Sequence, residues 1–270
     1  MPELPEVETV VRSLREDVIG RRILDIKNSW PNHLTSVGLV EMRKRVIGSQ
    51  ITGINRRGKY IVFGLSGADT MIIHLKMTGQ LLLQPASSAV RDHVHTTFLL
   101  SGDDELRFRD VRKFGRVYLT QEPVEILGQL GPEPLSESFT PELLNKMLLG
   151  RRRVLKPLLL DQHFIAGIGN IYADESLFHA KLAPNRISNT ISEDEGRQLN
   201  SSIRTTLQLA VDHGGATISD YRQPDGSKGE MQNSFKVYGR AGEPCGRCDG
   251  VVERIILGGR STFFCASCQI

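Results

Sequence analysis

Cys245-Gly246-Arg247-Cys248 and Cys265-Ala266-Ser267-Cys268 stand near the end of the chain and give its most specific structural signal. They contain all four cysteines of the sequence, and sixteen residues separate the two pairs. This spacing is typical of a tetrahedral zinc site with four thiolates, which leaves no position for water. We therefore expect one structural Zn²⁺. Two disulfides are the alternative, which a reducing cytoplasm disfavours.

The residues between the cysteine pairs predict a β-hairpin. Residues 251–257 and 261–264 are strand-like, and Gly258-Gly259 is a two-residue turn signal. We interpret residues 236–270 as a zinc finger with Arg260 at the hairpin tip. The finger could place Arg260 on DNA, or it could be a structural zinc ribbon with no part in DNA binding.

The region before the finger, residues 131–235, has helical signals. Helical spacing appears at 141–149, 154–160 and 170–180, and a capping box, Ser192-x-x-Glu195, opens a longer helix that closes near Gly214. Residues 155–172 predict two helices joined by a glycine-bearing turn. Free amide groups at the start of the second helix, with Asn170, suit a phosphate, although an αα-corner with core glycines is the other interpretation.

A long irregular segment follows the last helix. Residues 216–234 contain Pro224, Gly226 and Gly229, few apolar residues and no periodicity. Such a loop inside a compact domain is uncommon and is usually functional or disordered.

The first part of the chain, residues 1–130, predicts a β-sandwich. Residues 4–18 have one apolar helical face, and β-branched runs separated by turns follow as far as residue 120. The proline-rich linker 130–135 continues neither pattern. The expected fold is thus α+β in two domains, with a helix-capped antiparallel β-sandwich preceding a helical domain and its zinc-finger hairpin.

The N-terminus offers a possible nucleophile. Removal of Met1 would expose the secondary amine of Pro2 at the positive end of a helix, which lowers the pKa of an amine and keeps it nucleophilic. Glu3 could supply a proton, and Lys59 could stabilise a phosphate or a developing anion. Pro2 and Pro5 are also ordinary residues for the start of a helix.

Composition limits the class of protein without naming it. The chain has 270 residues, 39% hydrophobic content and a net charge of +3, which is too small to identify a nucleic-acid binder. Basic residues nevertheless cluster at 43–45, 56–59 and 151–153. No apolar run is long enough for a membrane span and no signal peptide is evident, so we expect a cytoplasmic protein.

These motifs, in this order, resemble a known family. Residues 1–9 (MPELPEVET), the linker 130–135, residues 169–172 (GNIY) and the four-cysteine finger are similar to bacterial formamidopyrimidine-DNA glycosylase from end to end. The resemblance implies a monomeric base-excision-repair enzyme that removes 8-oxoguanine and formamidopyrimidines from double-stranded DNA. It also implies a helix-two-turn-helix domain, cleavage of the abasic site by β,δ-elimination and a single zinc ion.

The resemblance also implies roles for individual residues. Pro2 would be the Schiff-base nucleophile at C1′, and Glu3 the acid for base release and ring opening. Lys59 would contact a phosphate and assist elimination, while Arg260 would bind the backbone and take part in δ-elimination. Further DNA contacts would be His74, His93, Arg151, Lys156, Asn170 and Tyr238.

Three more residues match the family's wedge, which enters the space left when a damaged nucleotide is flipped out of the helix. Arg112 would contact the orphaned cytosine, and Met77 and Phe114 would fill the vacated space. Without the resemblance, Met77 and Phe114 would be assigned to a hydrophobic core. The segment 216–234 corresponds to the family's base-recognition loop.

Two alternatives stay open. Endonuclease VIII is a relative with the same nucleophile that removes oxidised pyrimidines, but its members usually have glycine in place of Leu4 and lack the pattern of Arg112 and Phe114. The second alternative is a zinc-finger DNA-binding protein without catalysis, because the sequence does not prove that Met1 is removed.

Overall fold

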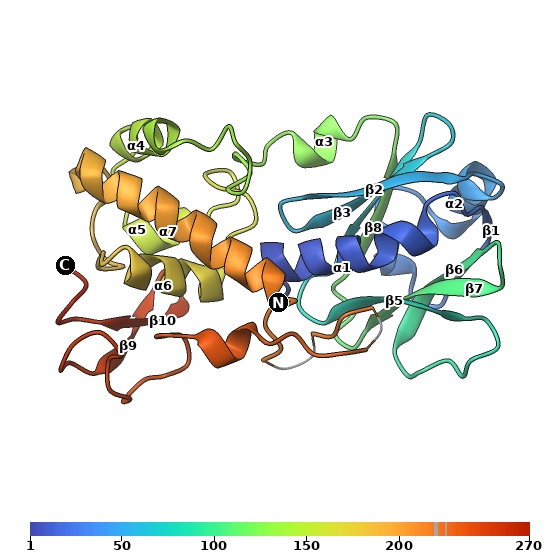
Figure 1. Cartoon of the computed structure of the whole chain (residues 1–270). Helices are drawn as coiled ribbons and strands as arrows, with labels where there is room; N and C mark the ends of the chain where they lie inside the picture. The colour runs from blue at the N-terminus through green and yellow to red at the C-terminus, as the bar shows by residue number, and fades with distance from the viewer. Residues whose placement is uncertain (219–220, 225) are drawn as a thin grey trace. The chain divides into compact units, whose positions relative to one another are not determined.

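A computed structural model describes residues 1–218, 221–224 and 226–270 (Figure 1). Within these ranges no helix is both long and apolar enough to cross a membrane. The chain divides into two compact units. Unit 1 contains Met1–Gln129 and His213–Glu230, and unit 2 contains Leu130–Asp212 and Met231–Ile270. Residues 213–230, which sequence analysis groups with the helical region, therefore make their contacts in unit 1.

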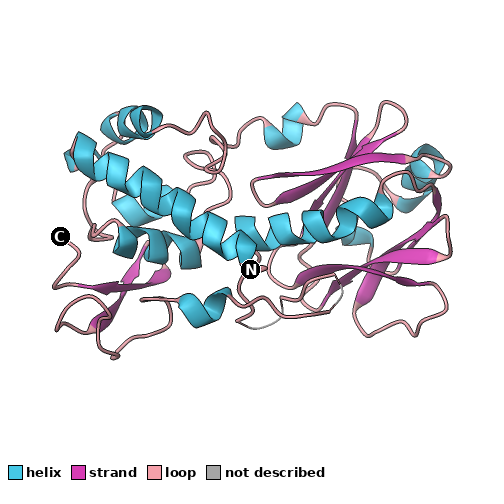
Figure 2. Cartoon of the chain, in the orientation of Figure 1, coloured by secondary structure: helices cyan, strands magenta, loops and turns pink. Residues whose placement is uncertain are grey.

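Unit 1 contains two four-stranded antiparallel sheets. Figure 2 draws the strands in magenta. In spatial order, one sheet joins β1 (Ile23–Asn28), β6 (Val94–Leu100), β7 (Asp104–Asp110) and β5 (Gly79–Pro85), and the other joins β2 (Ile51–Arg57), β3 (Tyr60–Leu65), β4 (Thr70–His74) and β8 (Arg116–Thr120). Side chains of both sheets and of the first helix form one hydrophobic core. The predicted helix-capped antiparallel sandwich is thus confirmed.

The first helix, α1 (Leu4–Val18), has the predicted bounds because its apolar positions recur at helical spacing. Val7, Val11 and Leu14 lie on its fully buried face. Three short helical segments that the sequence did not predict complete the unit: η1 (Pro31–His33), α2 (Leu39–Val46) and α3 (Val124–Leu127).

Unit 2 is helical with a terminal hairpin. Its elements are α4 (Pro141–Leu149), α5 (Leu155–Leu159), α6 (Asn170–His179), η2 (Ser188–Thr190), α7 (Glu193–Asp212), η3 (Met231–Ser234), β9 (Val252–Leu257) and β10 (Arg260–Cys265). The capping box forms as predicted, because Ser192 N–H donates to Glu195 Oε2 at 2.8 Å and Glu195 N–H donates to Ser192 Oγ at 3.3 Å. The turn glycines Gly258 and Gly259 have positive φ angles, which matches the predicted two-residue hairpin.

Candidate functional site

The start of α1 brings together the first candidate residues. Pro2 is buried and the adjoining Glu3 is 3% exposed. The backbone N–H of Glu3 donates to Glu6 Oε2 at 2.7 Å, so Glu6 satisfies one of the free amides at the helix N-terminus. Met1 precedes Pro2 in the sequence, so the Pro2 nitrogen belongs to a peptide bond until Met1 is removed.

Glu6 also binds the segment 213–230 of the same unit. Its second carboxylate oxygen, Oε1, accepts a hydrogen bond from the backbone N–H of Ala216 at 2.8 Å. The Tyr221 hydroxyl donates to the backbone carbonyl of Glu6 at 3.3 Å. Ala216 and Tyr221, in the first part of the expected base-recognition loop, are therefore hydrogen-bonded to the first turn of α1, which follows Pro2 and Glu3. Positions 219, 220 and 225 of that loop lie outside the described residues.

Lys59 and His74 lie on neighbouring strands. Lys59 occupies the turn between β2 and β3, and His74 ends β4 opposite Tyr60 of β3. Burial, together with the nearby charges of Lys76 and Lys59, lowers the pKa of His74 to about 3. The imidazole is consequently neutral at physiological pH. Because His74 Nδ1 accepts from the backbone N–H of Lys76 at 2.9 Å, the proton is on Nε2, which can donate to a phosphate.

Two loop tips of unit 1 carry the candidate wedge. Met77 follows β4, and Arg112 and Phe114 follow β7; Met77 is 41% exposed and Phe114 is 44% exposed. The guanidinium carbon of Arg112 lies 4.8 Å from the centre of the Phe114 ring, a cation–π contact. His93 is exposed on a third loop, before β6. Large apolar side chains displayed at loop tips are suited to a partner that covers them.

In unit 2, Lys156 is held in a buried network. Its side chain is 0% exposed, and Nζ lies 2.7 Å from Asp174 Oδ1. Nζ also donates to Ser261 O at 2.9 Å and to Thr262 Oγ1 at 2.8 Å. Burial raises the pKa of Asp174 to about 7 against the opposing effect of the Lys156 charge. A direct phosphate contact by Lys156 would require it to leave this network.

Lys156→Met is expected to destabilise unit 2 by about 3–5 kcal/mol at pH 8, because it leaves the Asp174 carboxylate buried without its cation. The double variant Lys156→Met/Asp174→Leu should recover much of that loss, since both charges are then removed together. Urea unfolding of the variants measures the difference. Equal losses in the single and double variants would contradict the assigned ion pair.

Two other candidates of unit 2, Asn170 and Tyr238, contact the same hairpin. Asn170 begins α6, and its Nδ2 donates to Ser261 O at 2.9 Å, beside the exposed Arg260. Tyr238 is half-buried, with its ring 5.2 Å from that of Phe263, and its backbone N–H donates to the Glu175 carboxylate at 2.8 Å. Arg151 is exposed, and its guanidinium lies over the ring of Phe164; neither residue belongs to the hairpin.

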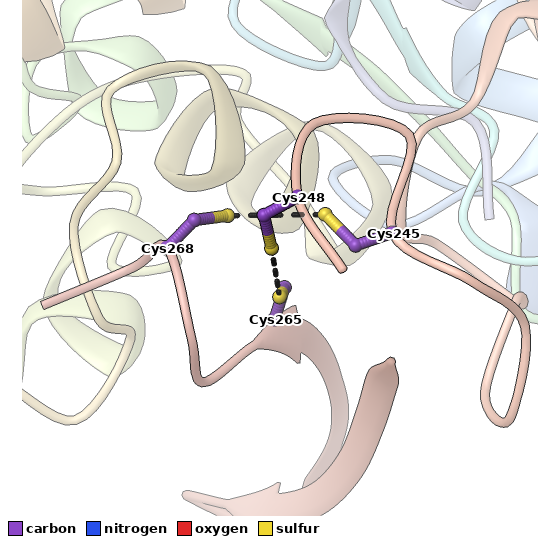
Figure 3. Close-up of side chains that lie close together, drawn as sticks. All are labelled: Cys245, Cys248, Cys265 and Cys268. Carbon is purple, nitrogen blue, oxygen red and sulfur yellow. Dashed lines mark hydrogen bonds between the residues drawn. The ribbon is translucent and has the colours of Figure 1, made fainter. Parts of the chain in front are cut away.

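The four cysteine side chains lie close together, as Figure 3 shows, in an arrangement that can hold a metal ion. Their sulfur atoms lie within 4.8 Å of one another, with Cys245 3.8 Å from Cys268 and Cys248 3.6 Å from Cys265. Tetrahedral zinc with Zn–S distances of about 2.3 Å places its sulfur ligands roughly 3.8 Å apart. All four thiols are free, so the disulfide alternative is wrong and the donor set fits one structural zinc ion.

Some residues with evident structural importance were missed by sequence analysis. Glu6, Asp110, Asp174 and Glu175 are buried carboxylates that bind backbone amides or a buried cation. Glu6 had a visible signal, because it stands three residues after Glu3 at the start of a predicted helix. Asp174 and Glu175 had none, since their partners are distant in the sequence, and Asp110 binds the distant Thr78 as well as the nearby Gly115.

Family models cover most of the chain. The model of the formamidopyrimidine-DNA glycosylase N-terminal domain matches residues 1–117, and that of the same family's H2TH domain matches residues 130–222. A model described as a zinc finger found in FPG and IleRS matches residues 242–270.

Whole proteins match over their full length. A formamidopyrimidine-DNA glycosylase of Carboxydothermus hydrogenoformans is 44% identical over 269 residues and 100% of both chains. One of Chloroflexus aurantiacus is 44% identical over 100% of this chain and 98% of its own. A crystal structure of the Lactococcus lactis FPG mutant G226P with Fapy-dG containing DNA superposes with a TM-score of 0.93, at 39% identity and 99% coverage of each chain.

Proposed function

The chain belongs to the formamidopyrimidine-DNA glycosylase family, and we propose that it excises oxidised purines from DNA through covalent catalysis by Pro2. The observation that carries this proposal is the start of α1, where Pro2 and the acid Glu3 are buried together beside the attached loop. A secondary amine at that position can form an iminium ion with C1′ of the damaged nucleotide.

The proposed reaction begins once Met1 is removed. The lone pair of the Pro2 nitrogen forms a bond to C1′, and the glycosidic bond breaks with its electron pair leaving on the base. Glu3 is the acid for base release and for ring opening. The Pro2 nitrogen then passes its proton to the Glu3 carboxylate, and Glu3 gives that proton to O4′ as the C1′–O4′ bond breaks and an iminium ion forms. Loss of a C2′ proton then expels the 3′ phosphate, and a second elimination expels the 5′ phosphate.

Cationic and neutral hydrogen-bond donors would hold the DNA backbone during these steps. Lys59 and the Nε2–H of neutral His74 would bind phosphate oxygens from unit 1, with His93. Asn170 at the start of α6, Arg260, Tyr238 and Arg151 would do so from unit 2. We propose that Lys156 acts indirectly, because its buried ammonium fixes the hairpin backbone beside Arg260 and Asn170.

The wedge would stabilise the opened duplex. Met77 and Phe114 would occupy the space of the flipped nucleotide, and Arg112 presents donors that match the acceptors of cytosine. The zinc ion would keep the hairpin folded and would take no part in bond breaking, because four thiolates leave no open coordination position.

The lesion preference tests this proposal against the endonuclease VIII alternative. Single-turnover incision of 8-oxoguanine opposite cytosine is expected to exceed that of thymine glycol by about tenfold or more. This preference is expected because the chain has the Arg112 and Phe114 pattern. A well-placed hydrogen-bonding pair between a side chain and a base, as proposed for Arg112 and cytosine, gives roughly 1–3 kcal/mol of discrimination. A relative from Lactococcus lactis has been crystallised with DNA containing an oxidised pyrimidine, so some activity on such a base is compatible. Faster incision of thymine glycol would favour the alternative, and binding without any incision would favour a non-catalytic protein.

A further inference from the structure

Asp110, at the end of β7, is a buried carboxylate directly beneath the two wedge tips. Its side chain is 0% exposed. Oδ1 accepts from the Thr78 hydroxyl at 2.5 Å, and Oδ2 accepts from the backbone N–H of Gly115 at 2.6 Å. Thr78 adjoins Met77 and Gly115 adjoins Phe114, so one carboxylate binds the chain next to both apolar wedge residues.

Thr78 extends the network to the third wedge residue. The Thr78 hydroxyl donates to Asp110 and accepts from the backbone N–H of Arg112 at 3.0 Å. A hydroxyl can do both at once, because it has one proton and two lone pairs. The tip that contains Met77 and the tip that contains Arg112 are therefore joined through a single oxygen atom.

The backbone of Asp110 adds two further contacts. Its N–H donates to the carbonyl of His93 at 2.9 Å, and its carbonyl accepts from the N–H of Lys113 at 3.3 Å. Residue 93 and the wedge tips, which belong to three separate loops, are thus all bound to residue 110.

His33 and Gly115 close the space around the carboxylate. His33 is fully buried, with Nε2 3.5 Å from Asp110 Oδ2, Nδ1 3.1 Å from Thr96 Oγ1 and its ring 4.8 Å from that of Phe108. A β-carbon at Gly115 would lie 2.3 Å from Phe108 Cζ, so only glycine lets the backbone approach this closely. The hydrogen bonds and the close packing fix the same two tips.

We propose that Asp110 and Thr78 are positioning residues that hold Met77, Arg112 and Phe114 in one preformed arrangement before DNA binds. This inference rests on the wedge assignment made above. Loops that are already ordered do not lose backbone freedom on binding, and Arg112 reaches the opposite base with a fixed backbone. The hydrogen bonds to Asp110 hold its pKa below the usual range in spite of burial, so the carboxylate remains charged at physiological pH.

The test compares Thr78→Val with Thr78→Ser. Valine has the shape of threonine without the hydroxyl, so it removes the donor to Asp110 and the acceptor for Arg112 N–H, whereas serine keeps both. The readout is the ratio of single-turnover incision rates for 8-oxoguanine opposite cytosine and opposite adenine. A change in the amount of folded enzyme cancels in this ratio, so only a change in recognition moves it.

Thr78→Val is expected to lower the ratio by roughly tenfold, the effect of losing one or two net hydrogen bonds, and Thr78→Ser should keep it near the wild-type value. Arg112→Ala, the reference for the wedge itself, should lower the ratio at least as much. Asp110→Asn should also lower the ratio, and it replaces Thr78→Val as the test variant if the valine variant does not fold.

The outcomes separate the two proposals. A wild-type ratio in Thr78→Val and Asp110→Asn, with a reduced ratio in Arg112→Ala, would overturn the positioning role and leave the wedge intact. An unchanged ratio in Arg112→Ala would remove Arg112 from the wedge, and the positioning inference would then fail with it. Loss of the ratio in Thr78→Ser as well as Thr78→Val would also overturn the inference, because the hydroxyl would not be the cause.

Discussion

Pro2→Gly is expected to lower single-turnover incision of an 8-oxoguanine duplex by about a hundredfold or more. Glycine leaves a primary amine after removal of Met1, but it lacks the ring that restricts rotation about the N–Cα bond and holds the nitrogen at the start of α1. Displacing a reacting atom by about 1 Å can cost on the order of 100-fold in rate. Quenched-flow or manual time courses with enzyme in excess give the rate directly.

Pro5→Ala is the matched control. Pro5 is buried in the first turn of the same helix, and there alanine keeps the backbone carbonyl that accepts from Thr9 Oγ1 at 2.9 Å. If Pro2 were only a residue suited to a helix start, the two variants would lose similar stability and keep similar activity. The proposed chemistry instead requires a large loss of incision in Pro2→Gly and almost none in Pro5→Ala.

Cys248→Ser, or strong chelation, should greatly weaken binding of lesion-containing duplex. Zinc bound to four thiolates contributes on the order of 10 kcal/mol to the folding of comparable short segments, and residues 236–270 are too few for a self-sufficient core. Loss of the ion should disorder β9 and β10, and the Arg260 contact would disappear with them. The far-ultraviolet circular dichroism of the remaining helices and sheets should change little. Fluorescence anisotropy with an abasic analogue measures the affinity.

Arg260→Ala distinguishes the finger's contact with DNA from its folding. Because Arg260 is exposed, its replacement should leave zinc bound. The affinity for lesion-containing duplex should nevertheless fall as in the cysteine variant. Metal analysis confirms the zinc content of each protein. If Cys248→Ser bound lesion duplex as tightly as the wild type, the finger would have no part in DNA binding and the proposed role of Arg260 would be wrong.

Local patterns account for the parts of the fold that were predicted correctly. The helix Leu4–Val18 and the hairpin of β9 and β10 follow from apolar spacing and from the turn glycines. The helix Leu39–Val46 was missed, because it has eight residues and three consecutive basic side chains that resembled a surface cluster. Short elements depend on packing against their neighbours, which spacing does not report.

Contacts between distant segments explain what sequence analysis missed in the site. The resemblance made Lys156 a DNA contact, but its partner Asp174 lies on another helix and makes complete burial possible. Asp110 has no motif of its own, since its role depends on Thr78 and His33, far away in the sequence. The cysteines could be predicted because metal ligation restricts their spacing directly.

Borohydride trapping followed by mass mapping identifies the residue that bonds to the damaged nucleotide. Reduction during the reaction of the wild-type protein with 8-oxoguanine duplex should convert the iminium ion into a stable amine that links protein to DNA. Intact-mass measurement of the same preparation should first show that Met1 is absent. We expect a single adduct, on the N-terminal peptide at the Pro2 nitrogen. An adduct on Lys59 or another lysine, or trapping at wild-type yield in protein that retains Met1, would contradict it.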